Sequence, residues 1–234
     1  MILVLWDIDR TLLYVGDVDR LVYREVFEEV IGRPPDTLPA RGTGVTMPLA
    51  VQELLLANDV PAAETEHLTH HMVERLPTQL RLHHGALRTG GHLMPGALSA
   101  LEAVRQTPQL IPTVVTGNLQ ASAQIKLEAF GLADHVDMAV GGYASDDSHR
   151  PALVHIAQKR AESAYGQPFT RDNTVIIGDS VQDVRTGREG GAKVIGVASG
   201  TTTAQRLEHE GADHVIPDLT DTNLLLRLIG NPRR

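Results

Sequence analysis

Residues 2–11 read ILVLWDIDRT, an apolar run that ends at two aspartates. The run from Ile2 to Trp6 is rich in β-formers and predicts a buried strand. Asp7 and Asp9 stand where this strand ends, which is the edge at which open α/β sheets build their sites. The stretch therefore predicts a sheet with a carboxylate site, suited to a metal, at the end of its first strand.

Strand and helix patterns alternate along the chain after Met94-Pro95-Gly96. Apolar runs predict strands at 111–115, 136–140, 174–178, 193–197 and 214–216. Helical spacing predicts helices at 97–106, 119–130, 151–164, 181–190 and 203–210. Such alternation implies an α/β fold with a doubly wound parallel sheet and right-handed crossovers. The strand at 2–6 belongs to the same sheet, so residues from about 15 to 90 are an insertion.

This insertion is predicted to be all-helical. Helices are expected at 18–31, at about 48–58 and at about 64–83, with a loop at 36–47 that is rich in Pro, Gly and Thr. Gly32 is expected to end the first helix. Asp17-Val18-Asp19-Arg20 looks like a second copy of the first acidic motif, but no strand precedes it, so it is interpreted as a helix N-terminus.

Three further polar motifs fall where strands of the predicted sheet end, or where the next helix begins. They are Thr116-Gly117-Asn118, Gly178-Asp179-Ser180 with Asp183 one helical turn later, and Arg150 before Pro151. At the carboxyl edge of a parallel sheet these motifs would converge with the first one on a single crevice. Hard oxygen ligands in that number suit Mg²⁺, and such a site performs phosphoryl chemistry by positioning and charge neutralisation.

Composition excludes several classes of function. The 234 residues carry 29 acidic and 21 basic side chains, a formal net charge of -8 without a basic stripe, which argues against nucleic acid as a partner. No cysteine is present, so a disulfide framework, a thiolate metal site and a cysteine nucleophile are excluded. The apolar opening lacks a basic flank and no run approaches membrane length, so we expect no membrane partner and a cytoplasmic protein.

Taken together, the motifs resemble the four motifs of the haloacid dehalogenase-like (HAD) hydrolase superfamily. The matching residues are Asp7-Ile8-Asp9-x-Thr11, Thr116-Gly117-Asn118, Arg150-Pro151 and Gly178-Asp179-Ser180-x-x-Asp183. The insertion resembles the small helical cap of phosphoglycolate phosphatases and β-phosphoglucomutases. The resemblance implies a Rossmann-like catalytic core of residues 1–14 and 91–234 and a helical cap domain of residues 15–90.

The same resemblance implies roles for the acidic residues. Asp7 would attack the phosphorus of a small phosphorylated metabolite and form an aspartyl-phosphate. Asp9 would protonate the leaving oxygen and then activate water. Asp179, together with Asp7 and the Asp9 carbonyl, would bind Mg²⁺.

The remaining motif residues would bind phosphate or support the site. Thr116, the neighbouring Gly117 and the Asn118 backbone amide would hold phosphate oxygens. Arg150 would be both catalytic and phosphate-binding. Thr11, Ser180 and Asp183 would be supporting residues, with Asp183 tying the cation of the third motif in place or supporting the metal shell.

Two positions depart from the family pattern. Arg10 stands where relatives commonly carry Gly or another small residue, and Arg150 stands where Lys is usual. Arginine is a forked, always-charged donor that can still pair with phosphate. Lys126, on the helix after the second motif, is a less favoured substitute for Arg150, and Lys159 lies too far along its helix. Candidate substrate-facing residues are Arg10, Arg41 and Thr43.

The leading hypothesis is a Mg²⁺-dependent phosphatase, and two alternatives stay open. A phosphomutase of the β-phosphoglucomutase type would use the same nucleophile and return the phosphate to the substrate. A catalytically silent binding protein would keep the fold, and Arg10 and Arg150 are the features that favour it. Asp9 argues against a haloacid dehalogenase, and the lack of lysine in 15–90 argues against a phosphonate hydrolase with a cap lysine.

Overall fold

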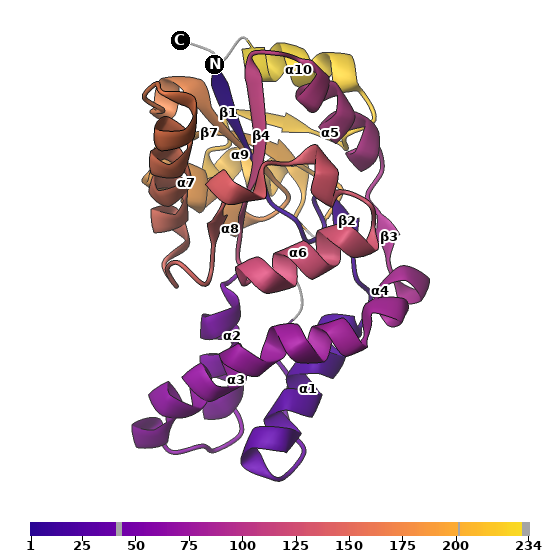
Figure 1. The fold of residues 1–234 in the computed structure, drawn as a ribbon, viewed down its shortest axis with the longest axis vertical. Coiled ribbons are helices and arrows are strands. Elements are labelled where there is room, and N and C mark those ends of the chain that lie inside the picture. The colour runs from indigo at the N-terminus through magenta and orange to yellow at the C-terminus, as the bar shows by residue number, and fades with distance from the viewer. Residues whose placement is uncertain (41–43, 201, 231–234) are drawn as a thin grey trace.

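A six-stranded parallel sheet forms the centre of the protein (Figure 1). The structure is a computed structural model that describes residues 1–40, 44–200 and 202–230. The strand order is β5-β4-β1-β6-β7-β8, so β1 lies at the middle, beside β4 and β6. The strands are β1 (Ile2–Trp6), β4 (Leu110–Thr116), β5 (Gly142–Tyr143), β6 (Thr174–Gly178), β7 (Lys193–Val197) and β8 (His214–Ile216).

Helices cover both faces of this sheet, because its central strands are apolar on both sides. Val4 and Trp6 face the core that includes α5 (Ala97–Gln106) and α10 (Thr222–Gly230). Leu3 and Leu5 face the core formed with α7, α8 and α9. Those helices are α7 (Arg150–Tyr165), α8 (Val181–Gly190) and α9 (Ala204–Glu210). The predicted α/β fold with a doubly wound parallel sheet is confirmed.

The segment between β1 and the rest of the sheet is mainly helical and lies beyond one end of the sheet (Figure 1). It contains α1 (Val18–Ile31), α2 (Met47–Leu56), α3 (Ala62–Leu82) and α4 (His84–Gly90). Gly32 ends α1 in the left-handed conformation, φ 80°, as its predicted C-cap position requires. An antiparallel pair, β2 (Leu13–Tyr14) and β3 (His92–Leu93), joins the two chain connections to this segment. The division into a core and a cap of residues 15–90 stays a prediction.

One predicted strand is wrong. Residues 136–140 form no strand; the region instead holds the short 3-10 helices η1 (Ala133–His135) and η2 (Met138–Val140), and the edge strand β5 follows. The Asp137 side chain caps η2 by accepting a hydrogen bond from the Ala139 amide at 3.0 Å. This local side-chain bond favours a turn over a strand. A third 3-10 helix, η3 (Arg171–Asn173), precedes β6.

The helix α6 (Gln120–Ala129) connects the sheet with the helical segment. It follows β4 in the chain and contacts both α3 and α4 (Figure 1). Among the described residues, no helix has the length and apolar character that crossing a membrane requires.

Candidate active site

Three adjacent strands bring the acidic and hydroxyl motifs to one edge of the sheet. Asp7 directly follows β1, Asp179 directly follows β6, and Thr116 is the last residue of β4. Because these strands are parallel neighbours, their carboxyl ends lie together. The Asp7 amide continues the ladder by donating to the Ile177 carbonyl at 2.9 Å. The geometry therefore brings the predicted first, second and fourth motifs together.

Arg150, the predicted third-motif cation, lies between two of the carboxylates. Its Nη2 donates to Asp7 Oδ1 at 2.9 Å and to Asp183 Oδ1 at 2.6 Å, and its Nη1 donates to the Gly44 carbonyl. All three side chains of this ion-paired group are buried. Burial opposes the charge of Arg150, but Asp183 and Asp7 raise its pKa, so the guanidinium stays charged. Arginine thus occupies the place predicted for it, at the first turn of α7.

Asp183 is held by the N-terminus of α8 as well as by Arg150. Ser180 is the N-cap of this helix, and its amide and hydroxyl donate to Asp183 Oδ2 at 2.9 and 2.6 Å. The Asp183 amide donates back to Ser180 Oγ at 3.2 Å, which completes a capping box. Both carboxylate oxygens of Asp183 are therefore engaged, and the residue orients Arg150 rather than facing the cavity.

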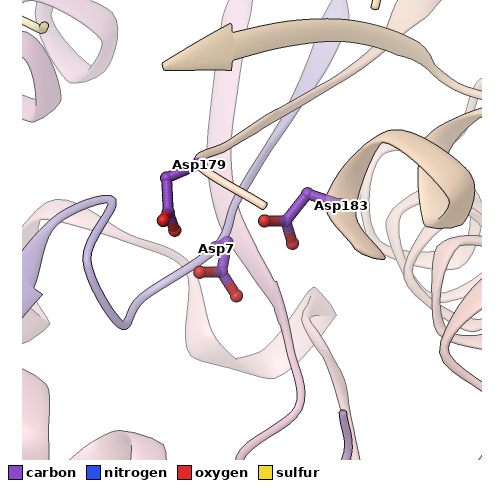
Figure 2. Close-up of side chains that lie close together, drawn as sticks. All are labelled: Asp7, Asp179 and Asp183. Atoms are coloured by element: carbon purple, nitrogen blue, oxygen red, sulfur yellow. The ribbon is translucent and has the colours of Figure 1, made fainter. Parts of the chain in front are cut away.

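Three buried carboxylates converge at this edge (Figure 2). One oxygen of each of Asp7, Asp179 and Asp183 lies within 4.8 Å of the others. The Thr11 hydroxyl lies between Asp7 Oδ2, at 3.4 Å, and Asp179 Oδ1, at 3.2 Å. Gly200 also approaches closely, since a Cβ there would lie 1.8 Å from Asp179 Oδ2.

The electrostatics of this cluster favour a bound cation. Burial, followed by the charge of Asp183, raises the pKa of Asp7 well above its ordinary value, against the lowering effect of Arg150. The same two causes raise the pKa of Asp179 from 3.8 to about 7, although the Thr11 hydroxyl lowers it. One buried guanidinium does not balance three buried carboxylates. Their oxygens are the hard ligands that suit a divalent cation, so the residues fit a metal site.

Asp9 does not join that cluster through its carboxylate. Lys126 Nζ donates to Asp9 Oδ1 at 2.9 Å and to Oδ2 at 3.0 Å, and Asn118 Nδ2 donates to Oδ2 at 2.7 Å. The same ammonium donates to Asp19 Oδ2 at 2.8 Å. The Asp9 carboxylate thus has donors of its own, and its backbone carbonyl remains the metal ligand that the sequence resemblance implies.

The turn after β4 presents a hydroxyl donor. Thr116 Oγ1 accepts hydrogen bonds from the Asn118 amide at 3.2 Å and from Asn118 Nδ2 at 2.8 Å. Since both of these bonds use the oxygen as acceptor, the hydroxyl hydrogen is left to donate. Gly117 lies against the loop of the insertion, where a Cβ would come within 2.7 Å of the Val45 carbonyl.

A cavity of about 170 Å³ joins these groups. Asp7, Asp9, Thr116 and Asp179 line its floor, while α1 and the segments around it contribute walls; the wall residues include Tyr14, Asp19, Arg20, Tyr23 and Val45. Arg10 also lines the cavity, with its guanidinium 4.8 Å from the centre of the Tyr14 ring. The predicted substrate-facing residues Arg41 and Thr43 lie outside the described residues.

Arg10 has an unusual backbone. Its φ is 65°, in the left-handed region that non-glycine residues adopt at a cost of about 1 kcal/mol or more. Among the described residues its guanidinium has no carboxylate within salt-bridge distance. This strained arginine lines the same cavity as Asp7, and its charge opposes the rise that burial causes in the pKa of Asp179, so it is placed to attract an anionic ligand.

Two participants were not identified from the sequence in the roles that they take here. The sequence indicates Lys126 only as a less favoured substitute for Arg150 and Asp19 only as part of a helix N-terminus, yet the two side chains form one ion-paired group with Asp9. The available signal was spacing: Lys126 falls four residues after Ser122 and three after Ala123, in the buried stripe of α6. A lysine in such a stripe needs a buried partner.

Comparisons with known proteins agree with this geometry. Residues 149–222 match a family model described as HAD-hydrolase-like. A search of curated proteins finds no match.

Solved structures share the fold over nearly the whole chain. They include a hydrolase from Pseudomonas syringae, with 22% identity over 98% of each chain and a TM-score of 0.69. A proposed phosphoglycolate phosphatase from Lactobacillus plantarum has 21% identity over 95% of this chain and 97% of that chain, with a TM-score of 0.65. A proposed β-phosphoglucomutase from Bacteroides vulgatus has 17% identity over 99% and 89%, with a TM-score of 0.64.

Proposed function

We propose that this chain is a haloacid dehalogenase-like hydrolase and a Mg²⁺-dependent phosphatase, because residues 149–222 match that family's model and solved hydrolase structures share the fold. Its substrate would be the phosphate monoester of a small metabolite. The observation that carries the proposal is the position of Asp7, at the end of the central strand, with Arg150 on one oxygen and Asp179 beside it. A carboxylate so placed can attack phosphorus and form a covalent intermediate.

The reaction would proceed in two displacements. An oxygen of Asp7 bonds to phosphorus as the ester P–O bond breaks, and Asp9 gives the leaving oxygen a proton. Water then attacks the aspartyl-phosphate, gives its proton to Asp9, and the bond from Asp7 to phosphorus breaks. The products are the free alcohol and inorganic phosphate, and both aspartates return to their starting states.

Two donors would hold the phosphoryl oxygens during both displacements. The Thr116 hydroxyl has its hydrogen available, and Arg150 already lies 2.9 Å from Asp7 Oδ1. Preorganised donors of this kind stabilise the charge that develops in the transition state. Asp7, Asp179 and the Asp9 carbonyl would hold Mg²⁺, which neutralises charge on the transferring phosphoryl group when it is bound.

The substrate is proposed to be small and anionic beyond its phosphate. The cavity volume of about 170 Å³ suits a metabolite rather than a polymer. Arg10 and Arg20 both line the cavity, and the Arg10 guanidinium is without a carboxylate partner among the described residues. A carboxylate or a second phosphate on the substrate would match these charges. A cytoplasmic location stays a prediction.

Phosphate release from a panel of small phosphate esters, with and without Mg²⁺, tests the proposal. We expect Mg²⁺-dependent release that Asp7→Asn abolishes while the far-UV circular dichroism is unchanged. Asp172→Asn is the matched control, because Asp172 is exposed at the opposite edge of the sheet, before β6. An undiminished rate in Asp7→Asn, or no release from any ester, would refute the phosphatase. An isomerised sugar phosphate without free phosphate would favour the phosphomutase.

A further inference from the structure

Lys126 is a buried ammonium that the mechanism above does not use. Its side chain is 1% exposed, on α6, and its three hydrogens match its three contacts: Asp9 Oδ1, Asp9 Oδ2 and Asp19 Oδ2. Burial favours its neutral form, but the charges of Asp19 and Asp9 raise its pKa above the ordinary value, so it stays charged. The side chain thus joins an aspartate of the site to an aspartate on α1.

Stability alone does not account for a charge in this place. Taking an ammonium out of water costs several kcal/mol, and a well-packed apolar side chain in place of a buried ion pair is often neutral or stabilising. The residues on the same face of α6 as Lys126, which are Ser122, Ala123 and Ala129, are buried and carry no charge, so an uncharged residue would suit this stripe. The ammonium is better explained by what it does to Asp9.

Counting hydrogen bonds shows which atom of Asp9 is left free. A carboxylate offers about four lone-pair positions, two on each oxygen. Oδ2 accepts from Asn118 at 2.7 Å and from Lys126 at 3.0 Å, whereas Oδ1 accepts from Lys126 alone, at 2.9 Å. One position therefore remains, on Oδ1, and Asp9 lines the cavity that Asp7 also lines.

We propose that Lys126 is a positioning residue that fixes the Asp9 carboxylate so that Oδ1 meets the leaving oxygen of the substrate. This inference rests on the phosphatase function proposed above. In the first displacement the ester P–O bond breaks, its electron pair stays on the leaving oxygen, and the proton on Asp9 Oδ1 moves to that oxygen. In the second displacement the attacking water gives its proton to the same Oδ1.

Asp19 fixes the ammonium in turn. It lies in the first turn of α1, so Lys126 is held between the segment after β1 and the start of α1. Asp19 Oδ1 is buried without a hydrogen-bond partner among the described atoms, so this carboxylate depends on Lys126 for its pairing. Removing the Asp19 carboxylate should make the Lys126 ammonium less well fixed while leaving its contact with Asp9. We therefore expect a smaller loss of proton transfer from Asp9 than removal of Lys126 itself would cause.

The test compares two esters that differ in their need for a proton. p-Nitrophenolate leaves without protonation, whereas the alkoxide of glycerol 2-phosphate requires it. We expect Lys126→Met to lower kcat/KM for glycerol 2-phosphate by about 100-fold and that for p-nitrophenyl phosphate by less than about threefold, given the range for general acid catalysis. Since kcat/KM reports steps up to the first departure of the leaving group, it isolates this proton transfer. Asp9→Asn should show the same selectivity.

Matched variants separate positioning from folding. Lys126→Arg should restore at least part of the glycerol 2-phosphate activity. Ser122→Ala, a buried change on the same helix whose hydroxyl makes no hydrogen bond among the described atoms, should leave both esters unaffected. If Lys126→Met does not fold, the double variant Lys126→Met, Asp19→Asn removes the unpaired buried carboxylate and should show the same selectivity.

Each outcome of this comparison decides the inference. A folded variant that loses activity equally on both esters, or on neither, overturns the role of Lys126 while the phosphatase stands. Wild-type protein that hydrolyses neither ester nor any other ester in the panel overturns the proposed function, and this inference with it.

Discussion

Asp179 should make the stability of the metal-free protein fall as the pH rises. Its carboxyl has an ordinary pKa of 3.8, and burial beside Asp183 raises this to about 7 in the folded state. Between these values the folded state keeps the proton and the unfolded state has released it. The free energy of unfolding therefore decreases through this window as the pH rises. Asp179 does not change it below about pH 3.8, and its full destabilising effect is present above about pH 7.

The size of the effect follows from the two pKa values. At about 1.36 kcal/mol for each pKa unit, the rise from 3.8 to about 7 amounts to about 4 kcal/mol. Roughly 3 kcal/mol of this falls between pH 5 and pH 8. Asp7 contributes in the same direction, because burial also raises its pKa. Mg²⁺ should reverse the loss at pH 8, by about 2.7 kcal/mol at a hundredfold excess over its Kd.

Urea unfolding followed by far-UV circular dichroism, without divalent cations, measures this effect. Asp179→Asn, which cannot ionise, should reduce the loss between pH 5 and pH 8 by about 3 kcal/mol and should weaken the stabilisation by Mg²⁺. Asp172→Asn, at an exposed position, should leave both unchanged. Equal pH dependence in Asp179→Asn and wild type would show that burial does not act on this carboxyl as described.

Three further predictions concern the neighbouring side chains. Arg150→Met should destabilise the protein by about 3–5 kcal/mol, because the buried carboxylates of Asp7 and Asp183 would lose the cation that they share; an unchanged unfolding midpoint would contradict this. Thr116→Val should lower kcat by about 100-fold, since it removes one donor to the phosphoryl group, and should cost about 1–3 kcal/mol of stability because the buried Asn118 amide loses its acceptor; steady-state kinetics with a KM effect alone would argue against the role in catalysis. Arg10→Gly should relieve the φ of 65° and keep stability within about 1 kcal/mol of wild type. The same variant should raise KM about tenfold for 2-phosphoglycolate but not for 2-hydroxyethyl phosphate, and equal KM changes would exclude charge recognition.

The sheet could be predicted from the sequence because its strands are continuous apolar runs. β1, β6 and β7 have the predicted bounds, and so have α1 and α8, whose ends carry clear signals such as Gly32. The strand predicted at 136–140 failed because Asp137 starts a 3-10 turn through its own side chain. The pair β2–β3 has two residues in each strand, too few for a periodic pattern to show.

The position of the candidate site was predictable for a related reason. Asp7, Thr116 and Asp179 each follow or end a recognisable strand, so topology alone brings them to one edge. The partners of Lys126 were not predictable, because Asp9 and Asp19 lie more than 100 residues away in the chain. Asp9 meets Lys126 because β1 pairs with β4, the strand before α6, and Asp19 meets it because the start of α1 lies near α6. The roles of these residues in catalysis stay predictions until the variants are measured.

Trp6 gives the protein an optical reporter at its centre. It is the single tryptophan of the chain, it is fully buried in β1, and it directly precedes Asp7. Its indole N–H is buried without a hydrogen-bond partner among the described atoms, so no fixed polar contact there dominates its surroundings. The arrival of a cation or a phosphoryl group one residue away changes the electric field at the indole. Intrinsic fluorescence, excited at wavelengths that tyrosine does not absorb, can therefore follow occupancy in real time without any attached dye.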